Sequence, residues 1–398
     1  MQSANNPISH HTSHTMGQGA ASSNGGDNRC GANCVDYNTN VATDGGDGVV
    51  QVSGGETGVD GGRNLEASVT GAGENHQNQT TTNNDESDDE SSLADSIGSV
   101  SDGPSFGETS IRSLGTMSNW SIIDTTLREG EQFATAHFDI ETKIKIARAL
   151  DDVGVEFIEL TSPASSPQSK LDAQAICKLG LKAKVLVHIR CNMDDARIAV
   201  ETGVDGINMC IGTSNQLMKN SHGKDLDWIA AKAKEVIEFV QSHGIEVRFS
   251  GEDSFRSDFS EILKLYSLMD RLGAHRVGIA DTVGGATPRE VYEKVSTLRQ
   301  MVGCGIETHF HNDTGCAVAN AYTAIEAGAT HIDCTVLGIG ERNGITSLSK
   351  LFQCMLAMGH DSVLTKYKLE KLPALEKLVA GVVDIQIPWN NASLQAYL

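Results

Sequence analysis

Two histidines, His309 and His311, are separated by one residue in the run ETHFHND. This run reads as a β-strand followed by the start of a helix. Residues two apart on a strand face the same side, so both imidazoles should point into one space. Two such imidazoles can supply two ligands to a divalent metal, and a carboxylate would complete a three-ligand site that leaves positions open for a substrate. The pattern therefore predicts a catalytic metal site whose third ligand lies elsewhere in the chain.

From Trp120 onward, β-rich runs alternate with helical patterns such as the amphipathic segments 141–153 and 227–242. The eight predicted strands are 121–124, 156–160, 184–189, 206–211, 245–250, 276–281, 306–310 and 331–338. Eight strand and helix units in series predict an α/β fold, a parallel (β/α)₈ or TIM barrel. Seven glycines fall just before strands, where helix C-caps are expected: Gly154, Gly180, Gly203, Gly244, Gly273, Gly303 and Gly328.

In such a barrel, catalytic groups collect at the carboxyl ends of the strands. Polar residues at the predicted strand ends are Arg128, Glu129, Gln132, Glu159, His188, Arg190, Asn208, Arg248, Ser250, Glu252, Thr282, His309 and His311. Any one of them could be a hydrogen-bonded core residue or a helix cap. A barrel does not need charged residues at six of its eight strand ends for stability, and burying unpaired charge is costly. Together they predict a functional site.

The chemistry follows from a metal flanked by Arg128, His188 and Arg248. Arginine binds carboxylates in bidentate geometry, and a metal can take a 2-oxo group together with the neighbouring carboxylate. The metal would act as a Lewis acid while a carbon nucleophile attacks the ketone. The residues therefore predict aldol or Claisen chemistry on a 2-oxo acid that carries several carboxylates.

Composition divides the 398-residue chain. Residues 1–118 lack lysine and carry 16 acidic side chains against three arginines, which accounts for 13 of the 21 net negative charges. Such a segment cannot bury enough apolar surface to order itself, so we expect a disordered acidic tail over 1–118, a catalytic barrel over 119–360, and a truncated linker or C-terminal extension over 361–398. The net negative charge argues against nucleic acid as a partner. The sequence contains no apolar run of 18 residues, which a membrane span would need.

The nine cysteines are scattered and lack the dense spacing of a disulfide scaffold. The N-terminus has no apolar signal core, and its acidic composition is unlike a mitochondrial transit peptide. These features predict a cytoplasmic or nuclear location, with mitochondria less favoured.

Seven motifs carry a family resemblance: DTTLREGEQ at 124–132 with Lys143 beyond it, ELTSP at 159–163, HIRC at 188–191, RFSGEDSFR at 248–256, GIADTVG at 278–284, HFHNDTG at 309–315 and GIGERNG at 338–344. Over about 120–391 the chain resembles homocitrate synthases of the fungal lysine pathway. The resemblance implies a homodimeric acyltransferase that condenses acetyl-CoA with 2-oxoglutarate to homocitrate in the α-aminoadipate route to lysine.

The resemblance also implies roles for residues. It makes Glu129, His309 and His311 ligands of zinc, magnesium or manganese, and Arg128 and Glu252 catalytic groups. The implied substrate-binding residues are Arg128, Gln132, Glu159, His188, Arg248, Ser250 and Thr282. Asn208 and Glu307 match the positions that would hold the ammonium of lysine as a feedback inhibitor, but Asn208 stands where family members place an aspartate. Loss of that carboxylate predicts weaker lysine inhibition.

The chain as given ends at Leu398, whereas family enzymes continue into a C-terminal region that supplies groups near the acetyl-CoA site. Without a base there, the expected loss in rate is on the order of 10² to 10⁴. Two alternatives therefore stay open. One is a non-catalytic paralogue or fragment that binds metal and oxo acid, and the other is a 2-isopropylmalate synthase, against which His188 and Arg190 favour a dicarboxylate.

Overall fold

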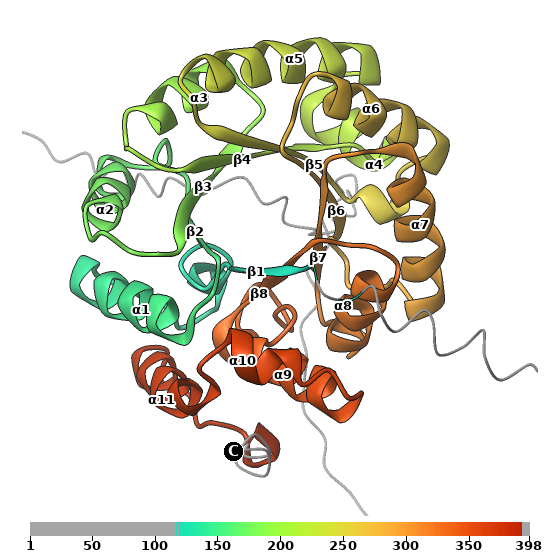
Figure 1. The fold of residues 1–398 in the computed structure, drawn as a ribbon. Coiled ribbons are helices and arrows are strands. Elements are labelled where there is room, and N and C mark those ends of the chain that lie inside the picture. Colours follow the sequence, from blue (N-terminus) through green and yellow to red (C-terminus); the bar gives the residue numbers. More distant parts are fainter. Residues whose placement is uncertain (1–116, 118, 392–398) are drawn as a thin grey trace, which may run out of the picture. The chain divides into compact units, whose positions relative to one another are not determined.

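In the computed structural model, the chain is described at residue 117 and over residues 119–391. The predicted disordered tail, 1–118, lies almost entirely outside the described residues, as do 392–398. The described region forms a closed barrel in which each strand is parallel to its two neighbours and strand order follows the sequence from β1 to β8 (Figure 1). The predicted (β/α)₈ barrel is therefore confirmed.

The observed strands agree closely with the expected ones. They are β1 (Ser121–Asp124), β2 (Phe157–Leu160), β3 (Lys184–Arg190), β4 (Gly206–Gly212), β5 (Glu246–Glu252), β6 (Arg276–Asp281), β7 (Gly305–Phe310) and β8 (His331–Cys334). The last strand is shorter than predicted, because Val336–Gly338 turn into a 3₁₀ helix in which Leu337 has a φ of 62°. This turn begins the GIGERNG loop.

Helices surround the strands in Figure 1. The longer ones are α1 (Ile140–Val153), α2 (Pro167–Cys177), α3 (Met193–Val200), α5 (Leu226–Ser242), α6 (Phe259–Arg271), α7 (Pro288–Met301), α8 (Ala317–Glu326), α9 (Leu348–Ala357) and α11 (Leu372–Val382). The short helices are α4 (Asn215–Leu217) and α10 (Ser362–Lys366). None of the helices in this part of the chain has the length and apolar character needed to cross a membrane.

Local sequence explains where the helices begin and end. Side chains of Asp139, Asn192 and Asp225 accept backbone hydrogen bonds at the first turns of α1, α3 and α5. Six of the seven glycines expected before strands have positive φ, as a C-cap requires. Gly303 is the exception, because α7 ends at Met301 and Val302 leaves the helix in an extended conformation.

The apolar core lies between the strands and the ring of helices. Ile158, Val187, Ile207 and Phe249 of neighbouring strands are completely buried there. Helix α11 contacts α1, and its Leu375 and Val379 belong to the same core. The barrel interior is different, because charged side chains point into it from most strands, and these build the site.

Candidate active site

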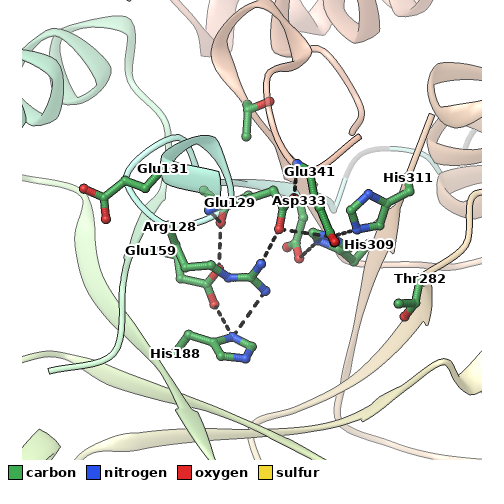
Figure 2. Close-up of polar contacts among 12 residues, drawn as sticks. Arg128, Glu129, Glu131, Glu159, His188, Thr282, His309, His311, Asp333 and Glu341 are labelled. Carbon is green, nitrogen blue, oxygen red and sulfur yellow. Dashed lines mark hydrogen bonds and ion pairs between the residues drawn. The ribbon is translucent and has the colours of Figure 1, made fainter. Parts of the chain in front are cut away.

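Three side chains meet at the carboxyl end of the barrel. Glu129 follows β1 in the turn before a 3₁₀ helix (Gly130–Gln132), His309 lies on β7, and His311 comes directly after that strand. One ligand atom of each lies within 4.8 Å of the others, and this is the single such group found among the described residues. Figure 2 shows both imidazoles turned toward Glu129. The structure thus brings together the three residues predicted to bind metal.

The protonation of these groups suits a cation. Burial lowers the pKa of His309 and of His311 to about 4, so both rings are neutral at pH 7. Burial alone would raise the pKa of Glu129, but the charge of Arg128, with that of His309 and His311 when they are protonated in acid, outweighs burial and lowers the pKa below its usual value. The Nε2 atoms of His309 and His311 are 3.3 Å apart, and buried Nδ1 of His311 has no hydrogen-bond partner in the described chain. Two neutral imidazoles and one carboxylate fit a divalent metal.

Glu129 is held from both sides. Its Oε1 accepts a hydrogen bond of 2.9 Å from the backbone N–H of Glu341, and its Oε2 is bound by Arg128. The loop that carries Glu341 approaches closely because Gly340 has no side chain, and a Cβ there would lie 2.8 Å from Glu129 Oε1. The loop is fixed further by the ion pair between Arg342 and Asp313, at 2.9 Å. The GIGERNG motif therefore lines one side of the site.

Arg128 links Glu129, His309 and His311, the candidate metal-binding group, to a second cluster. Its Nε lies 3.2 Å from Glu159 Oε2, and its Nη2 lies 3.3 Å from His188 Nδ1 (Figure 2). Burial, and then the charge of Arg128, lower the pKa of His188 to about 4. Although burial opposes it, Arg128 also holds the pKa of Glu159 well below its usual value. A fixed guanidinium thus sits beside the metal-binding group with a neutral imidazole behind it.

Asn208 and Glu307 lie deeper in the barrel, in the middle of β4 and β7. Asn208 Nδ2 donates to Glu159 Oε1 at 2.7 Å, and Asn208 Oδ1 accepts from Arg276 at 3.2 Å. Glu307 accepts from Arg248 Nε at 2.7 Å and from Arg276 Nε at 3.0 Å. Both residues predicted to bind lysine are therefore joined to arginines of this chain.

The other predicted site residues are distributed around the barrel mouth. Buried Ser250 donates to the carbonyl of Gly278, and Thr282 Oγ1 accepts the N–H of Asp253 at 2.9 Å. Burial, followed by the charge of Asp253, raises the pKa of Glu252. Gln132 is exposed in the loop after β1.

Arg190 does not belong to the site. Its side chain is 72% exposed and forms a bidentate pair with Asp195, with distances of 3.0 and 2.9 Å. Strand alternation turns Arg190 to the same side as His188, but Arg190 is the last residue of β3, where Asp195 at the start of α3 binds its guanidinium. The expectation that Arg190 favours a dicarboxylate is therefore wrong.

Sequence reasoning missed two groups in the barrel interior. Asp333 on β8 lies 3.0 Å from His309 Nδ1, and Arg276 on β6 joins Asn208 to Glu307. Both are charged residues within strands that were predicted to be buried, and a charge in a buried strand is the sequence feature that could have identified them. The backbone N–H of Glu341 was missed for another reason, since nothing in a side-chain pattern reports it.

The chain is similar in sequence to known proteins. Residues 119–379 match the family model described as HMGL-like. The chain is 64% identical over 286 residues to a protein of Yarrowia lipolytica named "Homocitrate synthase, mitochondrial", and the match covers 72% of this chain and 64% of that relative. A Schizosaccharomyces pombe protein of the same name is 61% identical over 289 residues, covering 73% of this chain and 69% of the relative. The chain therefore spans less than two thirds of the length of the Yarrowia protein.

A third relative carries a different location in its name. The Saccharomyces cerevisiae protein named "Homocitrate synthase, cytosolic isozyme" is 62% identical over 278 residues, covering 70% of this chain and 65% of the relative. The expectation of a cytoplasmic or nuclear location with mitochondria less favoured is wrong against this set, in which two of three similar proteins are named mitochondrial and none nuclear. Tail composition was a poor guide to compartment.

Solved structures support the fold. The crystal structure of an HMG-CoA lyase from Bacillus subtilis superposes with a TM-score of 0.61 at 22% identity, covering 70% of this chain and 98% of that chain. At that identity the likeness concerns the barrel alone. The family model and the relatives more than 60% identical show that this chain belongs to the HMGL-like family and, within it, to the homocitrate synthases.

Proposed function

We propose that this chain binds a divalent metal and 2-oxoglutarate and catalyses the condensation of acetyl-CoA with that oxo acid to homocitrate. One observation supports this most directly. The guanidinium of Arg128 contacts Glu129 of the metal-binding group on one side and Glu159 and His188 on the other. A cationic fork beside a metal suits a substrate that presents a ketone and carboxylates together.

The donor set Glu129, His309 and His311 would hold the metal, and zinc, magnesium and manganese are the ions we propose. When bound, the metal supplies Lewis-acid polarisation of the 2-oxo group. The protein contributes neutral imidazoles at pH 7, because burial lowers the pKa of both. No proton therefore has to leave these rings at neutral pH.

Arg128 and the residues around it would recognise the oxo acid. Arg128 would bind the carboxylate next to the ketone in bidentate fashion, and His188 would donate a hydrogen bond as a neutral ring. We propose that Gln132, Glu159, Arg248, Ser250 and Thr282 complete the substrate pocket. Arg248 already binds Glu307, so its contribution would be mainly to orientation and local charge.

Proton movement needs a group whose pKa lies nearer neutrality than that of a free carboxyl. Glu252, at the end of β5, meets this requirement, because burial and the neighbouring Asp253 raise its pKa. The charge of Arg128 interacts with Glu252 and opposes this rise in pKa. We therefore propose Glu252 as a proton carrier and Arg128 as the group that stabilises negative charge developing on the substrate.

Two other functions compete with this one. A non-catalytic chain would bind metal and oxo acid without turnover, and a 2-isopropylmalate synthase would prefer a branched 2-oxo acid. The second is less favoured, because Arg128, His188 and Arg248 make this end of the barrel polar, whereas a branched 2-oxo acid needs an apolar pocket. A homodimer remains a prediction that the single chain does not test.

Calorimetric titration of metal-loaded protein with 2-oxoglutarate, and with 2-oxoisovalerate as control, separates these functions when combined with an acetyl-CoA turnover assay. We expect selective binding of 2-oxoglutarate. Arg128→Lys should weaken it by roughly 10-fold to 100-fold, because lysine keeps the charge and loses the fork. Arg190→Lys is the matched control, since Arg190 is exposed and its guanidinium is bound by Asp195.

Each outcome is informative. Binding with turnover supports the synthase, and binding without turnover supports the non-catalytic alternative. Preference for 2-oxoisovalerate would replace homocitrate with isopropylmalate as the product. Absence of binding to folded, metal-loaded protein would reject the substrate.

A further inference from the structure

Asp333 is a buried aspartate on β8 that faces the candidate metal-binding group. Strands β7 and β8 are parallel neighbours with Glu307 opposite His331 and Thr308 opposite Ile332. Continuing this register puts His309 beside Asp333 on the inner face of the barrel. The two side chains meet there, with His309 Nδ1 and Asp333 Oδ2 3.0 Å apart (Figure 2).

Asp333 has few other contacts. Its side chain is 1% exposed, and its Oδ1 is buried with no hydrogen-bond partner in the described part of the chain. The neighbouring interior carboxylates differ in this respect, because Glu159 is paired with Arg128 and Glu307 with Arg248 and Arg276. A buried carboxyl group without a cationic partner destabilises a fold, so stability does not explain Asp333.

A contact with His309 does explain it. An imidazole has two ring nitrogens, and a carboxylate that accepts the Nδ1–H fixes the proton there and leaves Nε2 with a free lone pair. In this chain Nε2 of His309 is the atom that faces Glu129 and His311, at 3.9 and 3.3 Å. The same hydrogen bond also sets the plane of the ring.

We propose that Asp333 is a positioning residue for the metal site, which holds His309 so that its bare Nε2 points at the cation. This proposal rests on the proposed function of Glu129, His309 and His311 as metal ligands. Asp333 acts through His309 and is not itself a ligand. Asp333 lowers the stability of the fold, because an apolar or amide side chain would be more favourable at the same buried position.

The test compares Asp333→Asn and Asp333→Ala with the unaltered full chain. Cobalt(II) is the probe, since its visible absorption reports ligand geometry while chelator competition gives the dissociation constant. We expect both variants to bind cobalt about 10-fold to 100-fold more weakly, with an altered absorption band. In the metal-free state Asp333→Asn should melt at the same temperature as the unaltered chain or higher.

A second measurement reads the hydrogen bond directly. In the zinc-loaded chain, proton NMR should show an imidazole N–H that is protected from solvent exchange and is lost in Asp333→Ala. Asp124→Asn is the matched control, because Asp124 is equally buried on β1, is paired in register with Cys334, and accepts the N–H of Thr126, which asparagine can also do. Its cobalt affinity should stay within about twofold of the unaltered chain.

The outcomes separate the two proposals. If the unaltered chain binds no cobalt or zinc, the metal site itself is rejected. If it binds cobalt and both Asp333 variants bind with the same affinity and spectrum, the positioning role is rejected while the metal site stands. A lower melting temperature of metal-free Asp333→Asn with unchanged cobalt binding would show that Asp333 serves the fold.

Discussion

Glu129 and Glu341 are joined by a hydrogen bond of 2.9 Å although 212 positions separate them in the chain. The backbone N–H of Glu341, in the loop after β8, donates to the Oε1 atom of Glu129, in the loop after β1. These strands are neighbours where the barrel closes. Closure of the barrel therefore sets the orientation of Glu129, a proposed metal ligand.

Gly340→Ala should disturb this contact without removing any ligand. A Cβ at Gly340 would lie 2.8 Å from Glu129 Oε1 and 3.0 Å from its Cγ, so Glu129 or the loop must move. We expect a roughly tenfold or greater loss of cobalt affinity in chelator competition. Gly381→Ala on α11 is the control, because a Cβ there meets no atom within 4 Å. Equal cobalt affinity in the two variants would show that the loop does not position Glu129.

Asn208→Asp should create a stronger site for the lysine ammonium, a role that the family resemblance implies for this position. In this chain Asn208 donates to Glu159 and accepts from Arg276, so both polar atoms of its side chain are hydrogen-bonded to other residues of the barrel interior. A carboxylate there would repel Glu159 and attract a cation, and we expect lysine to bind at least about tenfold more tightly. Calorimetric lysine titration tests this, with Asn192→Asp at the N-cap of α3 as the control for added charge. Unchanged lysine affinity in Asn208→Asp would remove the predicted role of Asn208.

His331→Gln should reduce the sensitivity of the fold to acid. Burial, and then Arg276, lower the pKa of His331 from its ordinary 6.5 to about 4. Between these values the unfolded chain takes up a proton that the native chain refuses. The stabilisation is therefore complete above pH 6.5 and is lost as pH falls toward 4.

The expected size follows from the same shift. At about 1.4 kcal/mol per pH unit, His331 lowers the free energy of unfolding by roughly 2 kcal/mol between pH 7 and pH 5. Urea unfolding at both pH values should show a correspondingly smaller difference in His331→Gln. An identical pH dependence in the variant would mean that His331 titrates normally in the folded chain.

Lys143→Met should destabilise the chain by removing the cation from a buried cluster. Lys143 Nζ lies 2.7 Å from Glu131 Oε1 and 2.9 Å from Asp172 Oδ2, and these acids raise its pKa although burial opposes them. We expect a loss of about 2 to 3 kcal/mol in urea unfolding, because two carboxylates are left unpaired. Lys145→Met on the exposed face of α1 is the control and should change stability by less than about 0.5 kcal/mol. A loss no larger than in the control would show that the cluster is solvated.

Much of the molecule could be predicted from its sequence. The alternation of β-rich and helical runs gave all eight strands, because each period is set locally by which face a side chain must bury. The two-residue spacing of His309 and His311 predicted a shared direction, since strand geometry is independent of the rest of the fold. Glu129 was reached through its motif and strand end, and the structure brings it to the histidines.

Other features depended on contacts between distant segments. Arg276 joins Asn208 to Glu307, and His309 is hydrogen-bonded to Asp333, and in both cases the partners lie on different strands that are far apart in the sequence. Local pattern shows that a charged residue lies on a strand, but its partner is chosen by the register of the neighbouring strands. The sequence by itself determined the strands, their order and the types of ligand. Only the tertiary structure decided which charges meet, because barrel closure and strand register fix distances that no local spacing encodes.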